Sequence, residues 1–285
     1  MKITLAKSAG FCFGVKRAIE IAFKTAKKGA KVYMLGDIVH NEDVVRQIQK
    51  AGICKIERLS QGKGKILLIR AHGECKKTFA QAKKLGFQII DATCPMVREI
   101  HRIVKVMELA GYKIIIIGDK KHEEVRGISG QLENPAIIID PAEKLPLKKL
   151  QGYKKACVVV QSTQNLEKAV KVVANLKKVF QQLKFFNTIC RTTRLKQKEI
   201  KTLPKQNDLI IVIGSKTSAN TRRLYEIAKS INPRSFWVQS KDELKKGWFR
   251  KAKTIGITAG ASTPESTTQQ VISQIKKIAK NQKLT

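Results

Sequence analysis

Short apolar runs rich in β-branched residues recur along this chain, and each is followed by a helix-like stretch of Lys, Glu, Ala and Leu. This alternation predicts βαβ units with parallel strands. Three of the runs end alike, in Gly followed by Asp or Ser. They cover residues 32–37, 114–119 and 210–215.

A second apolar run follows each of these about forty residues later and ends in small or polar residues. These second runs cover residues 66–73, 157–163 and 255–262. In the first two repeats we expect a third strand, over 88–94 and 184–190, and each ends in a cysteine. The third repeat has no such element at its own end, but the N-terminal segment 3–12 also ends in a cysteine and is expected to complete it.

The repeats predict an α/β fold of three βαβ modules related by a pseudo-threefold axis, a trefoil. The expected modules cover residues 13–96, 97–193 and 194–285, the last completed by the N-terminal strand 1–12. Ligands of open parallel sheets bind beyond the carboxyl ends of the strands. Cys12, Cys94 and Cys190 therefore hold equivalent positions, and we expect the three thiols to point at one central site.

Three convergent thiolates suit an iron–sulfur cluster, and a cubane held by three cysteines leaves one iron open for substrate. A pure electron-transfer protein would complete its cluster with a fourth cysteine, which this pattern lacks. Taken singly, any of these cysteines is more simply a small buried apolar residue. Cys54, Cys75 and Cys157 have no counterparts in the other repeats, so we interpret them as structural, and no disulfides are expected.

Three of the four histidines, His40, His72 and His122, follow strand ends in predicted turns. A turn role explains any one of them, but three at related places indicate a common task in anion binding or proton transfer. His101 lies in a helix-like stretch and is interpreted as ordinary. Glu124, close to His122, would deliver protons if it is enclosed beside a cluster.

Two further loops, at 214–220 and 259–262, combine glycine with hydroxyl and amide side chains just before helical stretches. Backbone N–H groups and hydroxyls at helix starts bind phosphate. Ordinary helix capping explains each of these residues alone. The chain contains neither a Walker motif nor GxGxxG.

The composition, 42% apolar over 285 residues, is that of a folded globular protein. The apolar runs are too short for a membrane helix, and the N-terminus has no signal-peptide core, so we expect a cytoplasmic protein. The formal net charge of +35 attracts polyanions. A nucleic-acid-binding protein is therefore the alternative interpretation, although no recognised module and no aromatic residues among the lysines accompany the charge.

The ordered motifs occur at 9–15, 36–41, 70–73, 91–95, 122–127, 187–190, 214–220 and 258–262. Together they resemble, nearly end to end, those of the LytB (IspH) family of 4-hydroxy-3-methylbut-2-enyl diphosphate reductases, which belong to non-mevalonate isoprenoid biosynthesis. The resemblance implies one [4Fe–4S] cluster per chain, held by Cys12, Cys94 and Cys190. It also implies that the substrate hydroxyl is removed to give isopentenyl diphosphate, dimethylallyl diphosphate and water.

The same resemblance implies the remaining site residues and partners. Glu124, His122 and Ser162 are the implied catalytic residues, and Glu124 relays protons to the departing hydroxyl. The implied substrate-binding residues are His40, His72, His122, Ser162, Ser218, Ala219, Asn220 and Ser262. The implied electron donor is a ferredoxin or flavodoxin, and we expect a monomer that binds no membrane and no specific nucleic acid.

Three positions depart from the family pattern. The usual His-Pro-Glu has Glu123 in place of proline, and this extra carboxylate is expected to shift the titration of Glu124. The usual Gln-Thr-Thr has Ser162 in place of the first threonine, which keeps the hydroxyl and loses a methyl group. Ala219 stands for a common serine, and the loss of that donor is worth about 1 kcal/mol if the family uses it.

Overall fold

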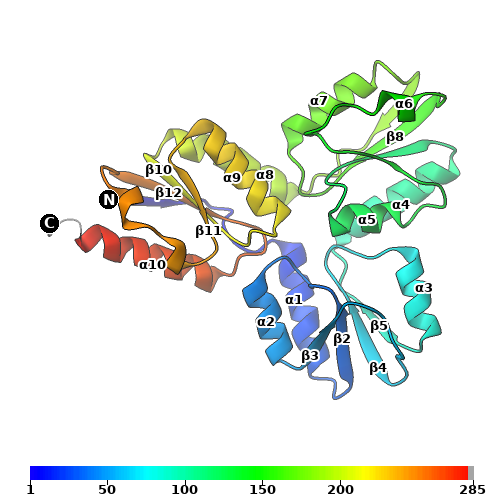
Figure 1. The fold of residues 1–285 in the computed structure, drawn as a ribbon, viewed down its shortest axis with the longest axis horizontal. Helices are drawn as coiled ribbons and strands as arrows, with labels where there is room; N and C mark the ends of the chain where they lie inside the picture. Colours follow the sequence, from blue (N-terminus) through cyan, green and yellow to red (C-terminus); the bar gives the residue numbers. More distant parts are fainter. Residues whose placement is uncertain (282–285) are drawn as a thin grey trace. The chain divides into compact units, whose positions relative to one another are not determined.

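The computed structural model describes residues 1–281, and their strands form three four-stranded sheets in which every pairing is parallel (Figure 1). This confirms the predicted α/β class with three modules. By the density of its internal contacts the chain divides into two compact units. One comprises Met1–Phe13, His40–Val44 and the chain from Arg191 onward, and the other comprises Gly14–Val39 and Val45–Cys190.

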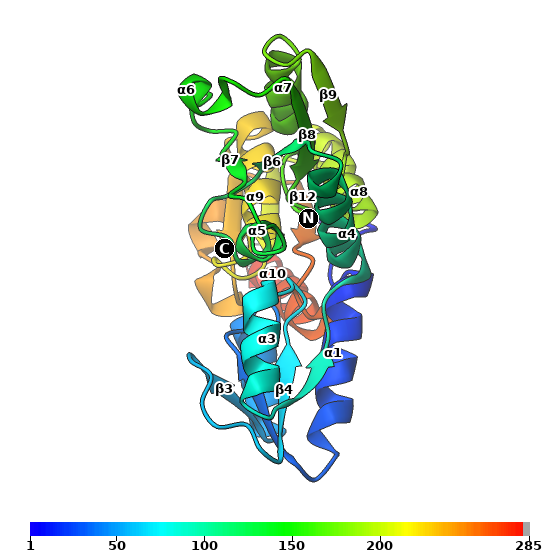
Figure 2. The same ribbon diagram turned by 90° about the vertical axis from the view of Figure 1, so that its right-hand side faces the viewer.

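The first module has the strand order β3-β2-β4-β5. Its strands are β2 (Lys31–Leu35), β3 (Ile53–Ile56), β4 (Lys65–Ile69) and β5 (Gln88–Asp91). Its helices are α1 (Phe13–Ala26), α2 (Glu42–Lys50) and α3 (Lys76–Lys84). In both views β4 lies between α1 and α3, and Ala82 of α3 shares an apolar cluster with Leu67 and Ile69 of β4 (Figures 1 and 2).

The second module repeats this order as β7-β6-β8-β9. Its strands are β6 (Lys113–Ile117), β7 (Ile137–Ile139), β8 (Lys155–Val160) and β9 (Gln182–Phe185). Its helices are α4 (Pro95–Leu109), α5 (Glu123–Ser129), α6 (Leu147–Leu150) and α7 (Leu166–Leu176).

The third module has the order β11-β10-β12-β1. Its strands are β1 (Lys2–Leu5), β10 (Leu209–Ile213), β11 (Ser235–Val238) and β12 (Thr254–Ala259). Its helices are α8 (Arg191–Thr202), α9 (Ala219–Ile231) and α10 (Glu265–Asn281), with short 3₁₀ turns at Leu203–Lys205, Lys241–Glu243 and Lys246–Phe249. Strand β1 pairs with β12 as β5 pairs with β4 and β9 with β8, which confirms that the N-terminal segment completes this sheet.

The sequence pattern did not predict the strand at the opposite edge of each sheet, which is β3, β7 or β11. These strands have three or four residues, and each combines buried with partly buried or exposed side chains. β7 is a run of only three isoleucines, and β3 and β11 each include a polar residue, so none of the three stands out as a strand in the sequence.

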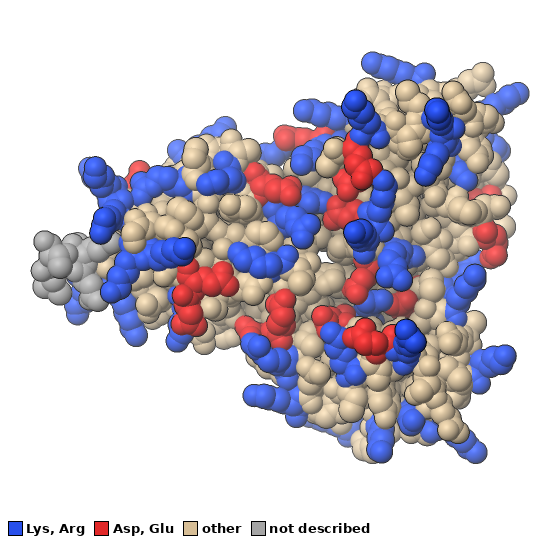
Figure 3. All heavy atoms as spheres, in the orientation of Figure 1, with Lys and Arg blue, Asp and Glu red and all other residues tan. Residues whose placement is uncertain are grey.

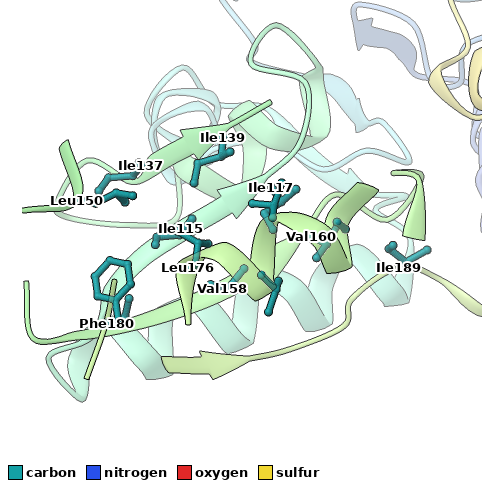
Figure 4. Close-up of a cluster of buried hydrophobic side chains, with 14 residues drawn as sticks. Ile115, Ile117, Ile137, Ile139, Leu150, Val158, Val160, Leu176, Phe180 and Ile189 are labelled. Atoms are coloured by element: carbon teal, nitrogen blue, oxygen red, sulfur yellow. The ribbon is translucent and has the colours of Figure 1, made fainter. Parts of the chain in front are cut away.

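The buried strands owe their continuous apolar sequence to helices on both faces of the sheet. In the second module, Ile115, Ile117 and Val158 face α7, where Leu176 is fully buried (Figure 4). The alternate residues of β6 and β8 face the other way and pack with Ile100 and Val104 of α4. Because successive strand residues point to opposite faces, a strand covered on both sides must be apolar throughout.

On the one face that is drawn (Figure 3), the excess positive charge is not gathered in a single patch. On the face shown in Figure 3, Lys and Arg side chains spread over all the modules, and Asp and Glu side chains lie among them. Within residues 1–281, no helix combines the length and apolar character needed to cross a membrane.

Candidate active site

The three cysteines at equivalent positions are fixed by equivalent backbone hydrogen bonds. The N–H of Cys12 donates to the carbonyl of Ala261 at 3.0 Å, that of Cys94 to Ala71 at 2.9 Å, and that of Cys190 to Ser162 at 3.1 Å. Each acceptor is the second residue after a central strand, because β12, β4 and β8 end at Ala259, Ile69 and Val160. The predicted equivalence of the three cysteines therefore extends to their backbone environment.

The expectation that strands run up to Cys12, Cys94 and Cys190 is wrong in detail, since β1 ends at Leu5. Strand β5 ends at Asp91, whose carboxylate accepts the Thr93 backbone N–H at 2.9 Å. This bond forms a turn that ends the pairing of β5 with β4. Strand β9 ends at Phe185, and the hydroxyl of Thr188 accepts the N–H of Val160 at 2.7 Å. Each cysteine thus lies in a loop directly before a helix.

The cysteines fit the role of cluster ligands. All three are half-buried, whereas Cys157 is fully buried, and burial raises the pKa of its thiol to about 12. Gly14 leaves room beside Cys94, because a Cβ at Gly14 would lie 2.5 Å from the Cys94 Sγ. That distance is much shorter than a van der Waals contact, so a side chain at position 14 would displace the Cys94 thiol.

Gly14→Ala is expected to reduce bound iron and sulfide severalfold, because the new methyl group and a fixed Cys94 thiolate cannot occupy the same space. Anaerobic iron and sulfide analysis after reconstitution measures the effect. Gly247→Ala is the matched control, since no atom lies within 4 Å of a Cβ at that position. Equal iron content in the two variants would contradict this account of Gly14.

Glu124 is enclosed between the second-module loops and bound at both oxygens. Its side chain lies on α5 and is 1% exposed. Oε1 accepts the backbone N–H of Ser162 at 2.6 Å, and Oε2 accepts the Ser162 hydroxyl at 2.7 Å. Burial raises the pKa of Glu124 to about 6, the Ser162 hydrogen bonds oppose the rise, and the charge of Asp119 adds to it. Such a carboxyl holds or releases a proton near neutral pH.

Two of the predicted histidines meet beside this glutamate. His122 caps α5, and its Nδ1 accepts the Glu124 backbone N–H at 3.1 Å, so the ring proton resides on Nε2. The ring of His72 makes an edge contact with that of His122, with centroids 5.7 Å apart. The structure therefore brings together Glu124, Ser162, His72 and His122 in the same unit as Cys94 and Cys190.

The other predicted residues belong to the unit that contains Cys12. The Ser262 hydroxyl donates to the His40 carbonyl at 2.8 Å. Ser218 caps α9 by accepting the Thr221 N–H at 3.3 Å, and Ala219 and Asn220 form the first turn of that helix, both buried. His40, His122 and Ser218 each stand four residues after a glycine that donates its N–H to the last residue of an edge strand. Each of the three modules therefore carries one of these polar residues at the equivalent position of the equivalent loop.

Sequence reasoning missed the side chains that anchor these loops. Lys196 is almost fully buried, and its ammonium group donates to the carbonyls of Ser8 and Ala259, the latter at 3.0 Å. Glu199 accepts the Ser8 N–H at 2.9 Å. Together they hold the segment that leads to Cys12, but a lysine and a glutamate in a basic helix give no sequence signal of burial.

Comparison with known proteins gives one consistent result. The sequence model of a family described as LytB protein matches residues 3–276. Among curated relatives, the "4-hydroxy-3-methylbut-2-enyl diphosphate reductase" of Geotalea daltonii is 39% identical over 281 residues and covers 99% of each chain. The protein of the same name from Clostridium perfringens strain 13 is 43% identical over 282 residues, covering 97% of this chain and 99% of its own.

Solved structures agree with these relatives. A structure of "(E)-4-Hydroxy-3-methyl-but-2-enyl Diphosphate Reductase, the Terminal Enzyme of the Non-Mevalonate Pathway" is 37% identical, with a TM-score of 0.72 over 97% of this chain and 99% of the other. The "E-1-hydroxy-2-methyl-but-2-enyl-4-diphosphate reductase from Plasmodium falciparum" is 30% identical, with a TM-score of 0.87 over 95% of this chain and 87% of the other.

Proposed function

Because this chain belongs to the LytB family, we propose that it catalyses the reductive removal of the hydroxyl group from 4-hydroxy-3-methylbut-2-enyl diphosphate. The allylic C–O bond breaks, a C–H bond forms, and two electrons and two protons are taken up. The products are isopentenyl diphosphate or dimethylallyl diphosphate, and water. The observation that carries the proposal is the matched backbone hydrogen bond of Cys12, Cys94 and Cys190.

These three cysteines are the proposed ligands of one [4Fe–4S] cluster. Soft thiolates on three equivalent loops suit such a cluster, and the space beside Cys94 that Gly14 keeps clear supports the assignment. When bound, the cluster supplies electrons and a Lewis-acidic iron to the reaction.

The chain's own polar residues bind the substrate and manage protons. Glu124 is the proposed proton donor to the departing hydroxyl, since its raised pKa keeps a useful fraction protonated near neutral pH. The Ser162 hydroxyl orients the Glu124 carboxyl and lies at the substrate. The proposed diphosphate-binding residues are His40, His72, His122, Ser218, Ala219, Asn220 and Ser262. His122 contributes through its Nε2–H, and Ala219 through the backbone at the start of α9.

The proposed setting is a monomer in the cytoplasm with an acidic ferredoxin or flavodoxin as donor. The +35 charge would speed the encounter with such a partner. For the modules we propose the boundaries 13–96, 97–193 and 194–285, with the N-terminal segment 1–12 belonging to the third.

The test is anaerobic reconstitution with iron and sulfide, followed by a turnover assay with 4-hydroxy-3-methylbut-2-enyl diphosphate and a chemical reductant. We expect an electronic spectrum of a cubane cluster and formation of both five-carbon diphosphates. A reconstituted protein that holds the cluster but leaves the substrate unchanged would contradict the proposed reaction.

A further inference from the structure

The loop after β4 and the start of α5 share a network of charged side chains. Glu123 is the first residue of α5, and its Oε1 forms an ion pair with the Arg70 guanidinium. Its second oxygen, Oε2, lies 3.6 Å from Nδ1 of His72. Arg70 also pairs with Glu74, which accepts the Thr78 hydroxyl at 3.2 Å. The network therefore links the first and second modules within one unit.

The charges of this network balance only when His72 is protonated. Arg70 contributes one positive charge, and Glu74 and Glu123 contribute one negative charge each. The side chains of Arg70 and Glu74 are 13% and 10% exposed, so water screens the remaining negative charge poorly. An imidazolium at His72 makes the four-residue network neutral.

The facing atoms lead to the same protonation state. Nδ1 of His72 and Oε2 of Glu123 are 3.6 Å apart, which is too far for a hydrogen bond, so the attraction between them is electrostatic. With Nδ1 protonated, the other ring nitrogen, Nε2, becomes a donor only in the doubly protonated ring. An opposite charge at this distance favours that cationic form.

Three other titratable groups of the same unit do not supply this charge. His122 accepts a backbone N–H at Nδ1 and is therefore neutral. His101 of α4 lies against Gly73, and burial lowers its pKa to about 4, so it too is neutral at pH 7. Glu124, on the same helix as Glu123, directs its carboxylate to Ser162.

The turn after β2 is shaped to admit Arg70. Gly36 has φ +68°, and a Cβ there would lie 2.9 Å from a guanidinium nitrogen of Arg70. The turn therefore needs glycine both for its backbone conformation and for this close approach. Arg70 is held on one side by that turn and on the other by two carboxylates, which fixes Glu123 toward His72.

We propose that Glu123 is a positioning residue that keeps His72 protonated at both nitrogens, so that His72 presents a cationic N–H donor to the substrate diphosphate. The identity of that anion rests on the proposed function. Because the Glu123 carboxylate favours the charged form of His72, the affinity of this chain for diphosphate should persist to higher pH.

The test compares Glu123→Gln, which removes the charge, with Glu123→Asp, which keeps it. Glu143→Gln is the matched control, because Glu143 pairs with Lys120 at the exposed surface of the same unit. NMR of the ¹⁵N-labelled histidine rings follows the loss of the His72 proton with pH, and calorimetry follows the binding of inorganic diphosphate. In Glu123→Gln we expect His72 to lose its proton at lower pH, and affinity near pH 8 to fall about tenfold.

Asp at this position is expected to restore most of both effects, and Glu143→Gln is expected to match the wild type. If Glu123→Gln does not fold, Glu123→Pro removes the same charge, and proline suits the first helical position after an extended His122 (φ −73°, ψ 137°). An unchanged His72 titration would overturn the inference, even if diphosphate affinity falls. The His72 titration needs no substrate. A wild type without turnover would therefore refute the proposed reaction, but the role of Glu123 could still be tested.

Discussion

Glu124→Gln is expected to lower the turnover number about a thousandfold while leaving the fold intact. The amide has the shape of the carboxyl group. Its oxygen can accept the Ser162 N–H, and its NH₂ group can donate to the Ser162 hydroxyl, which then changes from donor to acceptor in this contact. The amide cannot donate a proton to a departing hydroxyl. The measurement is the single-turnover rate of cluster-loaded protein, with thermal unfolding as the check on folding.

The pH profile separates proton transfer from a structural role. Burial raises the pKa of Glu124 to about 6, so the protonated fraction is full at lower pH and falls as the pH rises through that value. The wild-type turnover number should therefore decline above about pH 6, and the residual activity of Glu124→Gln should lack this limb. The same sign holds for stability: the contribution of a buried, protonated Glu124 is present at low pH and is lost as pH rises through about 6.

Glu99→Gln is the matched control for this prediction. Glu99 lies on α4 and pairs with Arg102 at the exposed surface, so its replacement removes a carboxylate without touching the loops of the site. We expect its turnover to stay within a factor of about two of the wild type. A Glu124→Gln variant that retains a tenth or more of the wild-type rate would contradict a proton-transfer role.

The repeat order was predictable because each central strand is buried on both faces. Covered strands such as β6 and β8 must be apolar throughout, and that run is visible in any single sequence. The N-terminal strand was placed beside β12 by the cysteine that ends its segment, and the pairing confirms it. The edge strands β5 and β9 were found in the same way, whereas β3, β7 and β11 have three or four residues and no cysteine after them to mark the repeat.

The direction of Glu123 was beyond sequence reasoning. Adjacency to Glu124 suggested that the two carboxylates would influence each other, but consecutive residues at a helix start point in different directions. Glu123 reaches Arg70 and His72, whereas Glu124 turns to Ser162, and the charge that adds to the raised pKa of Glu124 is that of Asp119. The contacts of Glu123 with Arg70 and His72 become visible only in the structure, where the loop after β4 lies against α5.

Replacing any one of Cys12, Cys94 and Cys190 by serine is expected to remove most of the bound iron and sulfide. The loss of an outer-shell partner commonly weakens metal binding ten- to a hundredfold, so the loss of a ligand should cost more than about a hundredfold. The three variants should behave alike, because their cysteines share the same backbone hydrogen bond and the same position before a helix. Iron and sulfide analysis under anaerobic conditions, with the electronic spectrum, measures the effect.

The remaining cysteines supply the controls. Cys54 is exposed, and Cys75 lies within 3.0 Å of the Thr78 hydroxyl, so serine is a mild change at either position. Cys157→Ser is a poorer control, because it places a hydroxyl group in a fully buried strand. If Cys75→Ser lost the cluster while Cys12→Ser kept it, the proposed ligand set would be wrong. The matching positions of Cys12, Cys94 and Cys190 would then reflect only the repeated fold.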